Sequence, residues 1–147
     1  AAAPAPEQLA NSGWAGRRVL VVDDAADCRD SLALMLQMAG SEVRTARDGL
    51  DARDVATGFE PAIVLMDIRM PKMDGYEAAR RLRAGPGGGE LVLIALTGWG
   101  QPEHLEKSRR AGFDAHLTKP VEAEKLLQVL AGFGPRTQAP EGAVTTA

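Results

Sequence analysis

The sequence has little cysteine, no long apolar run and little net charge. Cys28 is the only cysteine among 147 residues, which excludes a disulfide within the chain and a metal site built from cysteines. No apolar run reaches the roughly 18 residues of a membrane-spanning helix, so we expect no membrane partner. The formal net charge of -3 gives no electrostatic reason to expect direct nucleic-acid binding. Scarce cysteine is typical of a reducing compartment, and we predict a cytoplasmic location.

The chain also lacks an initiator methionine and a signal-peptide pattern, so we expect a piece of a longer protein, or a processed one. Its composition, 45% hydrophobic and 25% charged, is that of an ordinary globular protein, and its length suits one domain. Residues 1–16 are rich in Ala and Pro and are predicted to form a linker. Helical periodicity stops after residue 131. We therefore predict one domain over residues 17–131 and a flexible tail over residues 132–147.

Five apolar stretches of strand length alternate with stretches that carry apolar residues at helical spacing. Strands are predicted over residues 18–24, 42–46, 62–67, 91–97 and 113–118. Helices are predicted over residues 27–39, 48–58, 76–83, 102–111 and 122–131. Strict alternation of strand and helix is typical of a parallel sheet with helices on both faces. We therefore predict an α/β fold: a flavodoxin-like, doubly wound sheet of five parallel strands in the order 2-1-3-4-5, with five helices.

Local signals refine the helices. Three aspartates are predicted to cap helix N-termini, namely Asp27, Asp48 and Asp74. Three glycines are predicted to end helices, namely Gly40, Gly58 and Gly112. Leu50 is expected on an apolar helix face, and the Gly-rich residues 85–89 are expected to form a flexible connection. A basic group is expected on a solvated helix face, namely Arg80, Arg81 and Arg83.

Polar side chains stand where four of the predicted strands end. Asp23 and Asp24 follow the first apolar run, and Asp67 ends the third. Thr97 ends the fourth run and Lys119 follows the fifth. The carboxyl ends of parallel strands share one edge of a sheet, where ligands bind in open α/β folds. The sequence therefore predicts that these five side chains converge on one crevice between the first and third strands.

The residue types in this crevice suit phosphoryl transfer. Three carboxylates repel each other unless a cation lies among them, and hard oxygen ligands at an open site suit Mg²⁺. A carboxylate can act as a nucleophile and form an aspartyl phosphate. The reaction needs positioning and charge neutralisation around the phosphoryl oxygens, which a lysine and a hydroxyl can supply. Asp67, at the end of the long buried run, is the candidate nucleophile.

Five short motifs extend the case. They are Val21–Asp24, Val64–Asp67, Met70–Gly75, Ala95–Gly98 and Leu117–Pro120. In combination they resemble the receiver domain of two-component response regulators, and most of all the receivers attached to hybrid sensor histidine kinases. The resemblance covers residues 17 to about 131, which is most of the chain.

The resemblance implies a role for each polar residue. Asp67 is the expected phosphoacceptor, phosphorylated by a histidine kinase or a histidine phosphotransfer domain. Asp23 and Asp24, with the backbone carbonyl of Arg69, are expected to hold Mg²⁺ together with Asp67. Lys119 is expected to contact the phosphoryl group, and the peptide bond that follows it is expected to be cis.

The resemblance also implies a switch. Thr97 is the expected switch hydroxyl, and the surface formed by the fourth helix, the fifth strand and the fifth helix is expected to change shape and bind a downstream protein. His116 stands where receivers usually carry Tyr or Phe. An inward His116 would have to be neutral because a charged imidazole resists burial. The alternative is that His116 stays outward as part of the partner-binding face.

Two other functions remain open to comparison. A phosphohydrolase of the haloacid dehalogenase type carries a second aspartate two residues after its nucleophile, but that position is Arg69 here. An unphosphorylated interaction domain of receiver shape would not need the complete polar set. We therefore expect no enzyme activity beyond self-catalysed phosphorylation and dephosphorylation of Asp67. The 16 residues after residue 131 are too few for a DNA-binding module, so we expect output through a protein contact or through another part of a longer chain.

Overall fold

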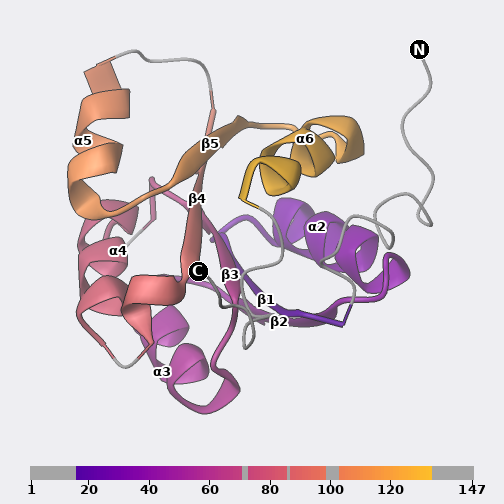
Figure 1. Cartoon of the computed structure of the whole chain (residues 1–147), viewed down its shortest axis with the longest axis horizontal. Coiled ribbons are helices and arrows are strands. Elements are labelled where there is room, and N and C mark those ends of the chain that lie inside the picture. Colours follow the sequence, from indigo (N-terminus) through magenta and orange to yellow (C-terminus); the bar gives the residue numbers. More distant parts are fainter. Residues whose placement is uncertain (1–15, 71–72, 86, 99–102, 134–147) are drawn as a thin grey trace, which may run out of the picture.

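A central parallel sheet organises the chain, whose computed structural model describes residues 16–70, 73–85, 87–98 and 103–133. Its strands are β1 (Arg18–Val22), β2 (Glu42–Ala46), β3 (Ile63–Asp67), β4 (Val92–Thr97) and β5 (Ala115–Thr118). Neighbouring strands pair in the order β2-β1-β3-β4-β5, and every pair is parallel (Figure 1). The predicted flavodoxin-like strand order is therefore confirmed.

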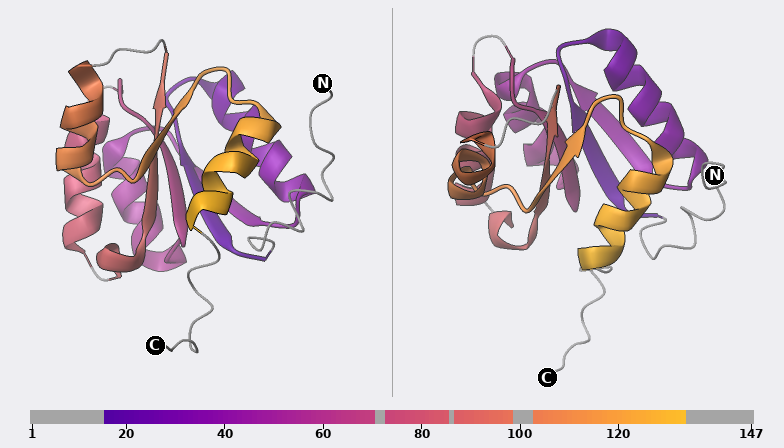
Figure 2. Two further views of the ribbon diagram at one scale, coloured as in Figure 1. Left: turned by 45° about the horizontal axis from the view of Figure 1, so that its top comes forward. Right: turned by 90° about the horizontal axis from the view of Figure 1, so that it is seen from above.

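Helices cover both faces of the sheet. One face is covered by α2 (Ala26–Met38) and α6 (Ala123–Phe133) (Figure 2). The other is covered by α3 (Gly49–Phe59), α4 (Gly75–Ala84) and α5 (Glu103–Ala111). A short 3₁₀ helix, η2 (Gly88–Glu90), precedes β4, so the Gly-rich connection contains an ordered turn. None of the described helices is long and apolar enough to cross a membrane.

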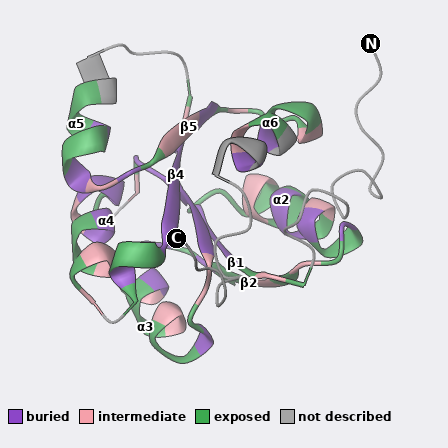
Figure 3. Cartoon of the chain, viewed as in Figure 1, coloured by how far each residue is buried: buried purple, intermediate pink, exposed green. Residues whose placement is uncertain are grey.

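Strand alternation divides the core into two layers. Successive side chains of a strand point to opposite faces of a sheet. Leu20 and Val64 accordingly pack with α3 and α4, whereas Val21 and Leu65 pack with α2 and α6. Strands β1, β3 and β4 are buried along nearly their whole length (Figure 3). Their continuous apolar runs therefore have no room for a charge except at the ends.

Two of the three predicted aspartate caps are confirmed. The side chain of Asp48 accepts a hydrogen bond from the backbone of Asp51, and that of Asp74 accepts one from Glu77, each at 2.9 Å. Asp27 is not a cap, because α2 already begins at Ala26. It lies in the first turn of α2, where a negative charge interacts favourably with the helix dipole.

The end of α3 also differs from the prediction. The helix continues past Gly58 to Phe59, and Glu60 takes the left-handed conformation with φ 54°. Continuing the helix buries the ring of Phe59, and that apolar burial outweighs the strain of a non-glycine residue at positive φ. Leu50, expected on the apolar face, is 43% exposed, whereas Ala52 is fully buried. Gly112 ends α5 as predicted, at φ 110°.

Arg83 is the clearest departure from the sequence prediction. Its guanidinium is turned into the protein rather than solvated, and its side chain is only 22% exposed. It donates to the backbone carbonyls of Gly88, Leu91 and Gly112 and to the carboxylate of Asp114. The same carboxylate accepts a bond from the backbone N–H of Leu93. Arg83 therefore ties the end of α4 to the starts of β4 and β5.

We expect Arg83→Lys to lower the free energy of unfolding by about 2 kcal/mol, because an ammonium cannot reproduce the planar fork that satisfies several buried carbonyls. The measurement is urea unfolding followed by circular dichroism. Arg81→Lys is the matched control: its side chain is 45% exposed and pairs only with Glu77 within its own helix among the described contacts. Equal stability of the two variants would show that the carbonyl contacts of Arg83 add nothing to stability.

Candidate functional site

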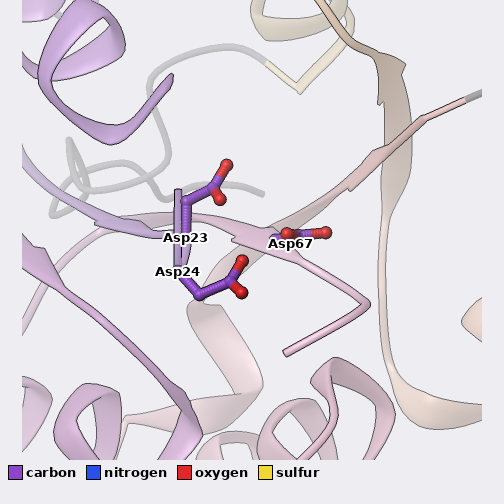
Figure 4. Close-up of side chains that lie close together, drawn as sticks. All are labelled: Asp23, Asp24 and Asp67. Carbon is purple, nitrogen blue, oxygen red and sulfur yellow. The ribbon is translucent and has the colours of Figure 1, made fainter. Parts of the chain in front are cut away.

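Three carboxylates meet at the carboxyl edge of the sheet. Asp23 and Asp24 directly follow β1, and Asp67 is the last residue of the adjacent strand β3. One oxygen from each side chain lies within 4.8 Å of the others (Figure 4). Asp23 is fully buried and Asp67 is 7% exposed, whereas Asp24 is exposed. The cluster is thus sealed on its protein side and open to solvent at Asp24.

Both the side chain and the backbone of Asp23 are fixed by polar contacts. Its Oδ1 accepts a hydrogen bond from the backbone N–H of Ala25 at 2.9 Å, and its Oδ2 lies 2.9 Å from the ammonium of Lys119. Its backbone carbonyl accepts a bond of 2.9 Å from Arg29 on α2, and its N–H donates to the carbonyl of Ala46 at 3.2 Å. The bond to Ala25 closes the turn after β1, which explains why α2 begins before Asp27.

Asp67 is held by its own loop and by Lys119. Its Oδ1 accepts a bond from the backbone N–H of Arg69 at 3.1 Å, and its Oδ2 accepts one from the Lys119 ammonium at 3.1 Å. Gly75 packs against this loop and donates to the carbonyl of Ile68 at 2.8 Å. A Cβ at Gly75 would lie 2.7 Å from the Asp67 carbonyl oxygen, so only glycine lets α4 approach the loop this closely.

Lys119 joins the strands of the site through one ammonium. It follows β5, and its backbone N–H donates to the carbonyl of Thr97 at 2.7 Å. Its peptide bond to Pro120 is cis, as expected. Thr97 is the last residue of β4, is half-buried and pairs in register with Thr118. The sheet therefore brings together the five polar residues that the sequence predicts at its edge.

The charges of the buried residues favour one reactive carboxylate. Burial alone would raise the pKa of Asp23, but hydrogen bonds from Ala25, Lys119 and Cys28 bring it below its ordinary value. Burial raises the pKa of Asp67, and Lys119 offsets this only in part. Burial would lower the pKa of Lys119, but the bonds to both carboxylates raise it. Asp23 and Lys119 therefore stay charged, and Asp67 carries the more basic, more nucleophilic carboxylate.

The cluster fits a divalent cation. Three carboxylates face one another, and among the described residues one ammonium, that of Lys119, pairs with them, so negative charge remains in excess there. Carboxylate oxygens are the ligands that Mg²⁺ prefers, and the exposed side at Asp24 leaves room for the waters that this ion retains. A bound Mg²⁺ would neutralise the excess negative charge beside Asp67 and polarise a phosphoryl oxygen.

Sequence reasoning missed three supports of this site. Arg29 on the carbonyl of Asp23 carries no signal except a basic residue in the first turns of the helix after an acidic pair. The role of Gly75 was predictable only as part of a short motif and not as a contact with Asp67. The thiol of Cys28 bonds to Asp23, and burial raises the pKa of Cys28 to about 11, so it remains a neutral donor.

Comparisons with known proteins agree with this geometry. A family model described as the response regulator receiver domain matches residues 19–131. The response regulator MprA of Mycobacterium sp. (strain KMS) is 36% identical over 125 residues, which cover 85% of this chain and 54% of the relative. The chain thus spans about half the length of that relative.

Solved structures are similar to the whole described domain. Chemotaxis protein CheY4 of Vibrio cholerae superposes with a TM-score of 0.75 at 33% identity, covering 79% of this chain and 97% of that one. The receiver domain of sensor histidine kinase PA1611 from Pseudomonas aeruginosa PAO1 gives 0.72 at 33% identity, covering 79% and 95%; it has a magnesium ion coordinated in its active-site cleft. By family model, sequence and fold, the chain belongs to the response regulator receiver domains of two-component systems.

Proposed function

We propose that the chain is a phosphoacceptor switch in which Asp67 takes a phosphoryl group from a phosphohistidine. The donor is a histidine kinase or a histidine phosphotransfer domain, and the chain acts in the cytoplasm, most like receivers attached to hybrid sensor histidine kinases. The magnesium-bound receiver of a sensor histidine kinase among the similar structures supports this kind of partner. The single observation that carries the proposal is the meeting of Asp67 with two more carboxylates and Lys119 at one sheet edge.

The residues divide the chemistry among them. An Asp67 carboxylate oxygen forms the new O–P bond while the N–P bond of the donor breaks, and the bonding electron pair stays on the donor imidazole. Lys119 is already within hydrogen-bond distance of Asp67. Its positive charge therefore stabilises the negative charge on the oxygens of the transferred phosphoryl group. Thr97 offers its hydroxyl from the next strand. Asp23, Asp24 and Asp67, with the carbonyl of Arg69, hold the magnesium ion.

The proposed output is a change of surface at one end of the sheet. By strand alternation and register, Thr97 and His116 lie on the same face of β4 and β5, two residues apart along the ladder. A hydroxyl drawn toward a phosphorylated Asp67 changes the space next to His116. This change reaches the surface of α5, β5 and α6, which binds a downstream protein partner.

A groove beside the site suits the approach of the donor. It measures about 430 Å³ and lies between α2 and the loop after β5, with Ser31, Met35, Pro120 and Val121 in its wall next to Lys119. Leu34 on the same helix is 58% exposed. A helix that carries the phosphohistidine can cover this apolar surface while its imidazole faces Asp67.

A hydrolase that uses a second aspartate is disfavoured by the loop after β3. The residue two places after Asp67 is Arg69, whose side chain is exposed and whose N–H bonds Asp67. The proposal therefore limits catalysis to the chain's own phosphorylation and dephosphorylation.

We expect the chain to gain one acid-labile phosphoryl group when incubated with Mg²⁺ and acetyl phosphate. Intact mass measures the gain. Asp67→Asn should abolish it and EDTA should suppress it, whereas Asp30→Asn, the same change on the exposed face of α2, should leave it intact. Phosphorylation of the Asp67→Asn protein, or a phosphoryl group that resists hydroxylamine, would contradict the assignment.

Mg²⁺ should raise the melting temperature, because it relieves the mutual repulsion of three carboxylates and binds only the folded chain. At ten times the dissociation constant the gain is about 1.4 kcal/mol. Asp24→Ala should remove most of this rise and, without metal, should itself raise the melting temperature. Asp30→Ala is the matched control and should keep the full response. If Asp24→Ala responds to Mg²⁺ like the control, Asp24 is not a ligand.

A further inference from the structure

Strand β5 and helix α5 each carry a buried polar atom without a partner in the described part of the chain. Among the described residues, Nε2 of His116 and Oγ of Ser108 are buried without a hydrogen-bond partner. We call the place where His116 lies, between β5 and the side of α5 that carries Arg109, the β5–α5 seam. Buried polar groups almost always find a partner, so an orphaned one calls for a physical explanation.

The ring of His116 has a defined place in this seam. Ala115 and Leu117 pack on the side of α2 and α6, so His116 points to the opposite face, where its register partner Ala95 belongs to the core. β5 is an edge strand of the sheet (Figure 1). A residue on an edge strand can exchange between the sheet face and solvent without breaking a strand pair.

The carboxylates whose side chains are described on α4 and α5, and Asp114 just before β5, are already paired with other cations. On α5, Glu106 pairs with Arg109 at 3.6 Å and with Arg110 at 3.3 Å. At the two ends of β5, Asp114 pairs with Arg83, and Lys119 pairs with the acidic cluster. On α4, the charged groups nearest that layer pair with each other, namely Glu77, Arg80 and Arg81. Lys107 lies over the ring of Tyr76, and the stretch of β4 that pairs with β5 carries Ala95 and Thr97 on this face, neither of which is charged.

We propose that His116 is a proton-dependent gate of the β5–α5 seam: its uncharged ring rests in the seam, and protonation drives the ring into solvent. Burial, and after it the positive charge of Arg109, lower the pKa of His116. The uncharged ring is therefore favoured above the ordinary imidazole pKa of about 6.5, and the inward state is lost progressively as the pH falls below it. The gate regulates the surface that the proposed function assigns to output, and in that respect it rests on that function.

An NMR titration of the whole chain tests the gate. Because the chain has two histidines, the His104→Gln variant leaves His116 as the only imidazole signal. We expect its pKa below the ordinary value. Arg109→Gln should raise this pKa, Arg109→Lys should keep it low, and Arg110→Gln, an equal loss of charge one residue away, should leave it unchanged. If His116 titrates at the ordinary imidazole pKa and Arg109→Gln does not change that pKa, the ring lies in solvent. That result would overturn the proposed gate.

Backbone amides provide the second readout. The amides of β5 and α5 should shift with the same midpoint as the His116 ring, and His116→Phe, which keeps an apolar ring but cannot bind a proton, should abolish that transition. The same transition in His116→Phe would assign it to another group and overturn the proposal. No phosphodonor or metal is present in these titrations, so their failure is distinct from a failure of Asp67 to accept a phosphoryl group.

Discussion

The ammonium group of Lys119 pairs with two carboxylates that belong to different strands. The burial of charged groups at the carboxyl edge of the sheet depends on these two ion pairs. Asp23 is excluded from solvent and Asp67 nearly so. Two buried carboxylates side by side would each cost several kcal/mol without a compensating charge. The ammonium lies 2.9 Å from one and 3.1 Å from the other, and so makes a buried acidic pair compatible with folding.

The same contact leaves the site reactive. One positive charge cannot neutralise three carboxylates, and Asp24 keeps the cluster open to solvent. Asp23 has further donors in Ala25 and Cys28, whereas the donors to Asp67 among the described residues are the backbone of Arg69 and Lys119. Unequal hydrogen bonding therefore separates two chemically identical side chains: one is a fixed anion, and the other is the more basic group.

The two edges of the sheet are built differently. At the amino ends of β4 and β5, Arg83 satisfies several backbone carbonyls and Asp114 at once. At the carboxyl ends stand the charged cluster, a half-buried threonine and, nearby, the orphaned nitrogen of His116. This division suits the proposed function, in which the output surface includes α5 and β5.

The strand order and the polar edge could be predicted from the sequence, because apolar runs of strand length alternate with helical periodicity and four of the five runs end in polar residues. The aspartate caps at Asp48 and Asp74 followed from local hydrogen bonding alone. Prediction failed where a second contact outweighed the signal on which it was based. The hydrogen bond from Ala25 to Asp23 closes the turn before α2, which therefore begins before Asp27. Burial of Phe59 extends α3 by one residue beyond Gly58.

Long-range contacts decided the rest. The sequence pattern predicts that Arg83 is a solvated cation on a helix face. Its side chain turns inward because Gly112 and Asp114, distant along the chain, lie close to it in space. The Asp67 loop accommodates α4 because Gly75 packs on its backbone, a contact that spacing cannot show. Local patterns specify which side chains end the strands; the pKa directions of Asp23, Asp67 and Lys119 arise only when the tertiary structure buries these groups together, because desolvation and charge pairing depend on distance in space and not along the chain.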